Sequence, residues 1–101
     1  MTRRIELKVG NLRNGHIHLR QVRDLLPARA IGGGNRSAAG KPVAVGFRPG
    51  QTVDTDRAGD KMIFRNRAAV REFFDKSGLT GGQAIEFEMA TARHFIVQPA
   101  Y

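Results

Sequence analysis

Residues 68–97, AAVREFFDKSGLTGGQAIEFEMATARHFIV, join the clearest helix of the chain to its clearest pair of strands. The helix is predicted over Ala68–Ser77, because its apolar side chains recur at i, i+3 and i+4 and give it one apolar face. Gly78 follows where a C-terminal cap belongs. The three apolar positions are Val70, Phe73 and Phe74.

The strands after this helix alternate apolar with polar side chains, the period of two that half-buried strands show. Ile85 to Met89 and then Phe95 to Val97 predict a closing hairpin that turns at Thr91–Arg93. Upstream, similar short segments predict strands at 5–9, 16–19, 42–47, 52–55 and 62–65, with one or two helical turns over Gln21–Leu26 stopped by Pro27. About seven short strands with two helices predict a mostly β, α+β fold in a single domain over residues 1–101.

Charge is concentrated in the first half of the chain. Residues 1–50 hold ten basic and two acidic side chains, whereas residues 51–101 hold seven of each, so the first half carries the whole net charge of +8. Thirteen of the 17 basic residues are arginine, the side chain best suited to bidentate contacts with phosphate and guanine. This composition favours a nucleic acid as partner.

Other classes of protein find little support in the composition. The chain has no cysteine, which excludes disulfides and thiolate metal sites and fits a reducing cytoplasm. No apolar run approaches the roughly 20 residues of a membrane span, and the N-terminus lacks the apolar segment of a signal peptide. We therefore expect a cytoplasmic protein with no membrane partner.

Two cofactor patterns are incomplete. Gly34–Lys41 resembles a phosphate-binding loop, but it has one residue too many between its glycines, and Pro42 stands where a magnesium-binding Ser or Thr is needed. His16 and His18 could bind zinc with His94, yet no neighbouring Cys or carboxylate completes a tetrahedral set. We expect neither a metal nor a cofactor, and we interpret Arg36 and Lys41 in the Gly-rich loop as phosphate contacts at a basic edge near DNA.

Several short stretches, in their order along the chain, resemble a known family. They are Asn11–Leu19 after the opening strand, Leu25–Pro27, Ile31–Gly33, Thr52–Asp56, Asp60-Lys61, Phe64–Arg67 leading into the Phe73-Phe74 helix, and Leu79–Gly82. The chain is similar to the DNA-binding pseudobarrels of plant B-three domains and restriction endonucleases, in particular the recognition domains of EcoRII-like and NgoAVII-like enzymes. Many members have Gly-Asp where this chain has Gly82-Gln83, a departure that bears on the turn there.

The resemblance implies an open seven-stranded pseudobarrel with two short flanking helices and two arms that grip the major groove of DNA. The first arm, about Asn11–Arg20, would present Arg13, Asn14, His16, His18 and Arg20. The second arm, about Asp54–Arg67, would present Asp56, Arg57, Lys61, Arg65, Asn66 and Arg67. No nuclease domain follows Tyr101 in this sequence, so the cleavage role of the restriction enzymes is not expected here.

The second arm mixes charges of both signs, which suits base reading because carboxylates accept from cytosine N4 and arginine binds guanine O6 and N7. Phe64 is expected in the core, and strand alternation then turns Arg65 outward, with Arg67 on the same face. Asn66 has two readings, a base contact or the N-cap of the following helix. A solvated hairpin with internal ion pairs is the alternative for the whole arm.

The leading hypothesis is a sequence-specific double-stranded DNA-binding module without catalytic residues, from a bacterial restriction–modification or related defence system. Its candidate partners are double-stranded DNA and a separate nuclease subunit or domain. One alternative is a protein that binds RNA or DNA through charge alone. A second is a metal-dependent nuclease that uses the Asp54–Asp60 loop, although an acid-x-Lys triplet typical of restriction nucleases is missing.

Overall fold

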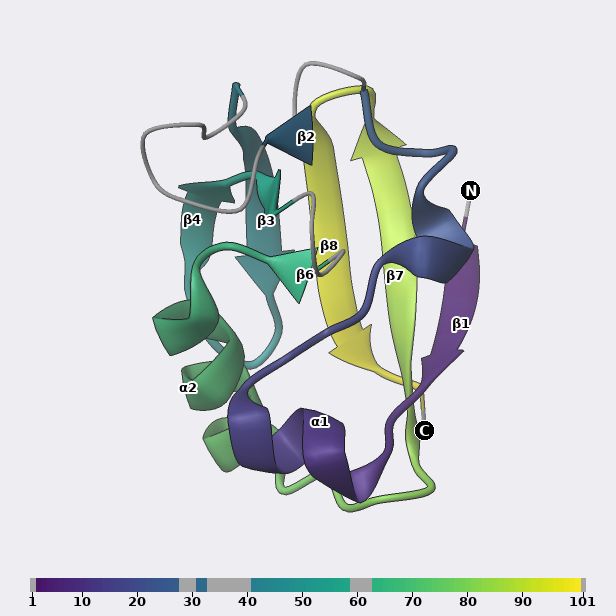
Figure 1. Ribbon diagram of the computed structural model, residues 1–101, viewed down its shortest axis with the longest axis vertical. Helices are drawn as coiled ribbons and strands as arrows, with labels where there is room; N and C mark the ends of the chain where they lie inside the picture. Colours follow the sequence, from purple (N-terminus) through teal and green to yellow (C-terminus); the bar gives the residue numbers. More distant parts are fainter. Residues whose placement is uncertain (1, 28–30, 33–40, 59–62, 101) are drawn as a thin grey trace.

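The computed structural model describes residues 2–27, 31–32, 41–58 and 63–100. Two layers make up the molecule, a five-stranded sheet behind and a layer of helices, turns and short strands in front of it (Figure 1). In chain order the elements are β1 (Thr2–Glu6), α1 (Val9–Asn14), the 3-10 helix η1 (Arg20–Val22), β2 (Ile31–Gly32), β3 (Val43–Phe47), β4 (Thr52–Thr55), β5 (Arg57–Ala58), β6 (Ile63–Phe64), α2 (Arg67–Ser77), β7 (Ala84–Thr91) and β8 (His94–Pro99).

The five-stranded sheet has the order β1-β7-β8-β3-β4. The predicted closing hairpin is confirmed as β7 and β8, and β1 lies antiparallel against β7. On the other side of the hairpin β3 runs parallel to β8, and β4 returns antiparallel to β3 after the turn at Pro49-Gly50. The sheet is therefore mixed, with β8, the last strand of the sequence, in the middle and β1, the first, at one edge.

A second, three-stranded sheet consists of β2, β5 and β6, each only two residues long. The expected hairpin from Thr52 to Arg65 was wrong in its first strand, because β4 pairs with β3, and only Arg57-Ala58 pairs with Ile63-Phe64. The mostly β, α+β class is confirmed. The described strands lie in a sheet of five and a sheet of three.

The core lies between the inner face of the large sheet and the front layer. Five phenylalanines fill it, and neighbouring rings have centroids 5.2 to 6.1 Å apart, within the range of favourable aromatic pairs. The front layer contributes Ile17, Leu19 and Val22, all completely buried. The phenylalanines are Phe47, Phe64, Phe73, Phe87 and Phe95.

The predicted long helix is confirmed as α2, with both ends capped as expected. The Asn66 side chain accepts a hydrogen bond from the Ala69 amide at 3.1 Å, and Gly78 ends the helix in the left-handed conformation at φ 68°. Val70, Phe73 and Phe74 are buried on its apolar face. This segment folded as predicted because its caps and its periodicity agree.

The opening strand is shorter than expected. It ends at Glu6, and Val9, which we expected to continue its buried face, is 61% exposed in the first turn of α1. The side chain of Asn11 accepts from the Lys8 amide at 2.8 Å at the start of this helix, and Gly15 ends it with φ 65°. Polar caps on both sides thus favour one helical turn and a half over two more strand residues.

The turn before β7 is closed by hydrogen bonds between Thr80 and Gln83. The Gln83 side chain accepts from the Thr80 amide at 2.7 Å, and the Gln83 amide donates back to the Thr80 carbonyl at 3.1 Å. Gln83 therefore closes the turn by itself. The turn also packs closely against the start of α1. A Cβ added to Gly81 would lie only 2.7 Å from a Val9 methyl group.

Candidate nucleic-acid interface

The two segments predicted as DNA-binding arms lie side by side in the front layer. His18 forms an isolated antiparallel bridge to Ile63 of β6. Arg67, at the start of α2, donates from Nε and Nη2 to the Asn14 carbonyl at 3.2 and 2.6 Å. α1 and α2 therefore meet at the lower front of the molecule, below β6 (Figure 1). Residues about 50 positions apart in the sequence form one surface.

The first arm combines a fixed backbone with accessible polar side chains. Ile17 and Leu19 are buried, and alternation leaves His18 and Arg20 exposed and His16 partly exposed. The two imidazole rings lie edge to face with centroids 6.0 Å apart. Arg13 and Asn14 are exposed at the end of α1. All five predicted side chains of this arm thus reach solvent, though from a helix and an irregular segment instead of a strand.

The second arm contradicts two expectations. Asp56 is only 4% exposed, and its carboxylate accepts from Nε and Nη2 of Arg65 at 2.7 and 3.0 Å. Arg65 is itself 20% exposed, so the prediction that it extends outward from the hairpin was wrong. Phe64 does enter the core, as expected. The reason for the difference is that a buried carboxylate needs a charged partner, and Arg65 is the residue across from it.

Asn66 and Thr55 strengthen this base of the hairpin. The Asn66 amide donates to Thr55 Oγ1 at 3.1 Å while the Asn66 side chain caps α2, so the structure supports the cap reading of Asn66. Arg67 is exposed and faces the end of α1. The side chain of Arg57 and the whole of Lys61 lie outside the described residues.

The predicted phosphate contacts in the Gly-rich loop are described only in part. Arg36 lies outside the described residues, and Lys41 is exposed beside the start of β3. A further arginine, which the sequence reasoning did not select, lies here: Arg93 donates to the Pro42 carbonyl at 2.6 Å.

Charge differs sharply between the two sides of the molecule. Residues 8–27 and 63–71, which we call the basic layer, carry seven Lys or Arg side chains and one carboxylate, Asp24. The side chains that point away from the core on the five-stranded sheet, which we call the outer face, include four carboxylates and one arginine among the described residues. They are Glu6, Asp54, Glu86, Glu88 and Arg4.

Asp24, the carboxylate of the basic layer, is paired with Arg3 of β1. Arg3 Nη1 and Nη2 bind the two carboxylate oxygens, the second at 2.8 Å, and Nη1 also donates to the Gln21 carbonyl at 3.0 Å. The hydrogen bonds from Arg3 lower the pKa of Asp24 below its ordinary value, and the same contact raises the pKa of Arg3. The pair fastens η1 to the edge of the sheet.

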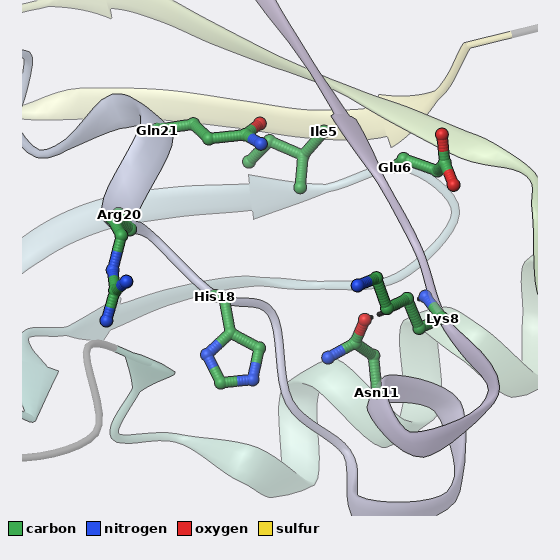
Figure 2. Close-up of a pocket in the computed structure, with 7 residues that line it drawn as sticks. All are labelled: Ile5, Glu6, Lys8, Asn11, His18, Arg20 and Gln21. Carbon is green, nitrogen blue, oxygen red and sulfur yellow. Dashed lines mark hydrogen bonds between the residues drawn. The ribbon is translucent and has the colours of Figure 1, made fainter.

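A hollow of about 460 Å³ opens between the end of β1, α1 and the segment that leads into η1. Figure 2 shows that the Lys8 ammonium, the His18 ring and the Arg20 guanidinium lie on one side of the β1 strand, whereas the Glu6 carboxylate lies on the other. Lys8, Asn11 and Gln21 were missed by the sequence reasoning. No local pattern singles them out, because the hollow exists only where three segments meet. Its lining residues are Ile5, Glu6, Lys8, Asn11, His18, Arg20 and Gln21.

The alternatives that involve a metal ion gain nothing from the geometry of the described residues. Within these residues, no group of three His, Cys, Asp or Glu side chains could hold a metal ion. His94 begins β8 on the outer face beside Gly46, whereas His16 and His18 belong to the basic layer. Asp54 is exposed on the outer face while Asp56 is buried, and Asp60 lies outside the described residues.

The part of the chain that the structure describes contains no helix with the length and apolar character needed to cross a membrane. A scan against protein-family models, a search of curated proteins and a search of solved structures found no match to this chain.

Proposed function

We propose that this protein binds double-stranded DNA through its basic layer, with sequence preference, as the non-catalytic recognition module of a restriction–modification or related defence system. The observation that carries the proposal is the separation of charge: the basic layer has seven basic side chains, of which Arg65 is paired with Asp56, and one carboxylate, Asp24, which is paired with Arg3, whereas the outer face has four carboxylates and one arginine. Such a distribution orients the protein toward a polyanion and repels it from the opposite side.

The proposal assigns phosphate contacts to the exposed arginines of the basic layer. Arg13, Arg20 and Arg67 are exposed and come from both arms, so they could follow a backbone across the front of the molecule. Arg71, next to Gly15, extends this row along α2. Base reading then belongs to two exposed polar side chains of the first arm, His18 and Asn14, and to Arg57 and Lys61 of the second. Arg65 and Asp56 are assigned to the framework.

We propose that the two sheets together form the open pseudobarrel that the resemblance implies, with the arms on its front. The protein would act in the cytoplasm, on its own or beside a separate nuclease subunit or domain that supplies cleavage. The rival that deserves a direct test is charge-driven binding of any nucleic acid, because the same basic layer would serve it.

Selection of bound duplexes from a random pool, followed by affinity measurements at several salt concentrations, tests the proposal. We expect an enriched sequence, and tighter binding to that duplex than to a random duplex or single strand. With about five to eight phosphate contacts, the slope of log K against log salt should be about −5 to −7. An unenriched pool with equal affinity for all strands would favour the charge-driven rival. Cleavage that needs Mg²⁺ would support the nuclease instead.

A further inference from the structure

The hollow beside the first arm has a lining unlike an ordinary gap between elements. Lys8, His18 and Arg20 lie along it, all three exposed, and Figure 2 shows them on the same side of β1. The one carboxylate of the lining, Glu6, is turned away from them. A ligand in the hollow would therefore meet two permanent positive charges and an imidazole, which favours an anion.

The hollow is larger than a small inorganic anion, and its lining includes apolar and amide groups besides the cations. A volume of about 460 Å³ falls within the range of sites that hold small organic molecules, about 300 to 1,000 Å³. The buried side chain of Ile5 forms an apolar part of the wall, and the amide end of Gln21 lies next to it (Figure 2). Asn11 uses its Oδ1 on the Lys8 amide, and its amide nitrogen is turned toward His18. These groups suit a planar polar ring.

We propose that the hollow is a binding site for one nucleotide, with the phosphate attracted by Lys8 and Arg20, which lie at opposite ends of the lining on either side of His18 (Figure 2), and with the base lying against Ile5 beside the Gln21 amide. Asparagine and glutamine amides match the donor and acceptor edges of a base, and Lys and Arg match its phosphate. The nucleotide has two candidate sources. The first is an unpaired residue at the end of a DNA duplex, and for this source the inference deepens the proposed function and rests on it. The other source is a free nucleotide.

The site is joined to both arms through His18. This residue lines the hollow and also bridges to Ile63 of the second arm. A nucleotide held there would consequently lie beside the duplex that the basic layer is proposed to bind. The arrangement fits recognition of a strand end next to paired DNA.

Titration of the ¹⁵N-labelled protein with AMP, followed by the backbone amide signals, tests the proposal. We expect AMP to shift the signals of Asn11, His18 and Gln21 at concentrations at least tenfold below those that adenosine or inorganic phosphate needs. A second pair of titrations compares a blunt duplex with the same duplex carrying one unpaired terminal nucleotide. A strand-end site responds to the overhang and not to the blunt end, whereas a free-nucleotide site responds only to AMP.

Two variants localise the effect. Lys8→Gln and Arg20→Gln should each weaken AMP binding at least tenfold, whereas Arg48→Gln and Lys76→Gln, exposed cations outside the basic layer, should leave it unchanged. The amide spectrum of each variant shows whether it is folded. The inference is overturned if AMP does not shift the amide signals of the residues that line the hollow, or if inorganic phosphate alone binds as tightly as AMP. Duplex binding without AMP binding removes this inference and leaves the proposed function. AMP binding without duplex binding supports this inference and removes the proposed function.

Discussion

The basic layer consists mainly of helices and irregular segments and the outer face of strands, and their carboxylates have different surroundings. On the outer face Glu86 and Glu88 are half-buried, and Glu86 lies opposite Arg4 across β1 and β7 and accepts a hydrogen bond from Gln98 at 3.4 Å. On the front of the molecule Asp24 and Asp56 are each bound by two nitrogens of an arginine. Arginine thus neutralises both of these carboxylates, so that neither opposes the positive potential of the remaining basic-layer side chains.

The largest expected effect concerns the buried carboxylate. Asp56→Ala should lower the free energy of unfolding by about 3 kcal/mol, because it leaves Arg65 without the partner that it binds at the base of the hairpin. Urea unfolding followed by circular dichroism measures the change. Glu88→Ala on the outer face is the matched control and should change the same quantity by no more than about 0.5 kcal/mol. Equal effects at both positions would end the distinction between the two classes of carboxylate.

The next effect concerns DNA affinity. The double variant Arg13→Glu/Arg20→Glu should weaken duplex binding by about 2–3 kcal/mol, or roughly 100-fold, because two exposed cations of the basic layer become anions. Fluorescence anisotropy with a labelled duplex at fixed salt provides the measurement.

The opposite reversal controls for net charge. Glu86→Arg/Glu88→Arg on the outer face changes the total charge by the same amount in the other direction and should alter affinity less than threefold. If the outer-face variant gains as much as the basic-layer variant loses, net charge and not the basic layer governs binding.

A smaller effect tests how tightly the first arm packs against α2. Gly15 and Gly78 both adopt the left-handed conformation, at φ 65° and 68°, so Ala at either position costs about 1 kcal/mol of backbone strain. At Gly15 the new Cβ would also lie 2.6 Å from the Arg71 side chain, whereas at Gly78 nothing lies within 4 Å. Gly15→Ala should therefore destabilise by about 2 kcal/mol in total, roughly twice the effect of Gly78→Ala. Thermal unfolding that ranks the two variants equally would show that Arg71 simply moves aside.

The smallest effect is the titration of Asp24. Its pKa lies below the ordinary value of 3.8 because Arg3 donates hydrogen bonds to the carboxylate. A lowered pKa means that the pair stabilises the folded state above the ordinary value, and that this contribution is lost as the pH falls through the folded-state pKa. The carboxyl ¹³C signal reports the midpoint directly. Arg3→Gln should return the midpoint upward toward 3.8, and high salt should move it the same way by screening the exposed pair. If neither Arg3→Gln nor high salt shifts the titration midpoint of Asp24, the Arg3–Asp24 pair does not persist in solution.

Sequence reasoning succeeded where local signals agree. The α2 helix, its Gly78 cap and the β7–β8 hairpin were predicted because periodicity and the capping glycine point to the same boundaries, and Asn66, which had two readings, is the N-cap in the structure. It failed at Val9, where alternation predicted a longer strand and the caps at Asn11 and Gly15 produced a helix. Within the candidate site, the exposure of Arg13 and Arg20 followed from the sequence, while the roles of Asp56 and Arg65 did not.

The sequence by itself determined the charge excess, the apolar positions of the core and the caps, since these depend on composition and on neighbours a few residues away. Only the tertiary structure decided which strands pair, because β4 could have joined either β3 or the following hairpin strand with a similar pattern. It also decided that Asp56 is buried against Arg65, and that Lys8, Asn11 and Gln21 share a hollow with the first arm. Burial and juxtaposition of this kind arise from contacts across tens of residues, which no local pattern encodes.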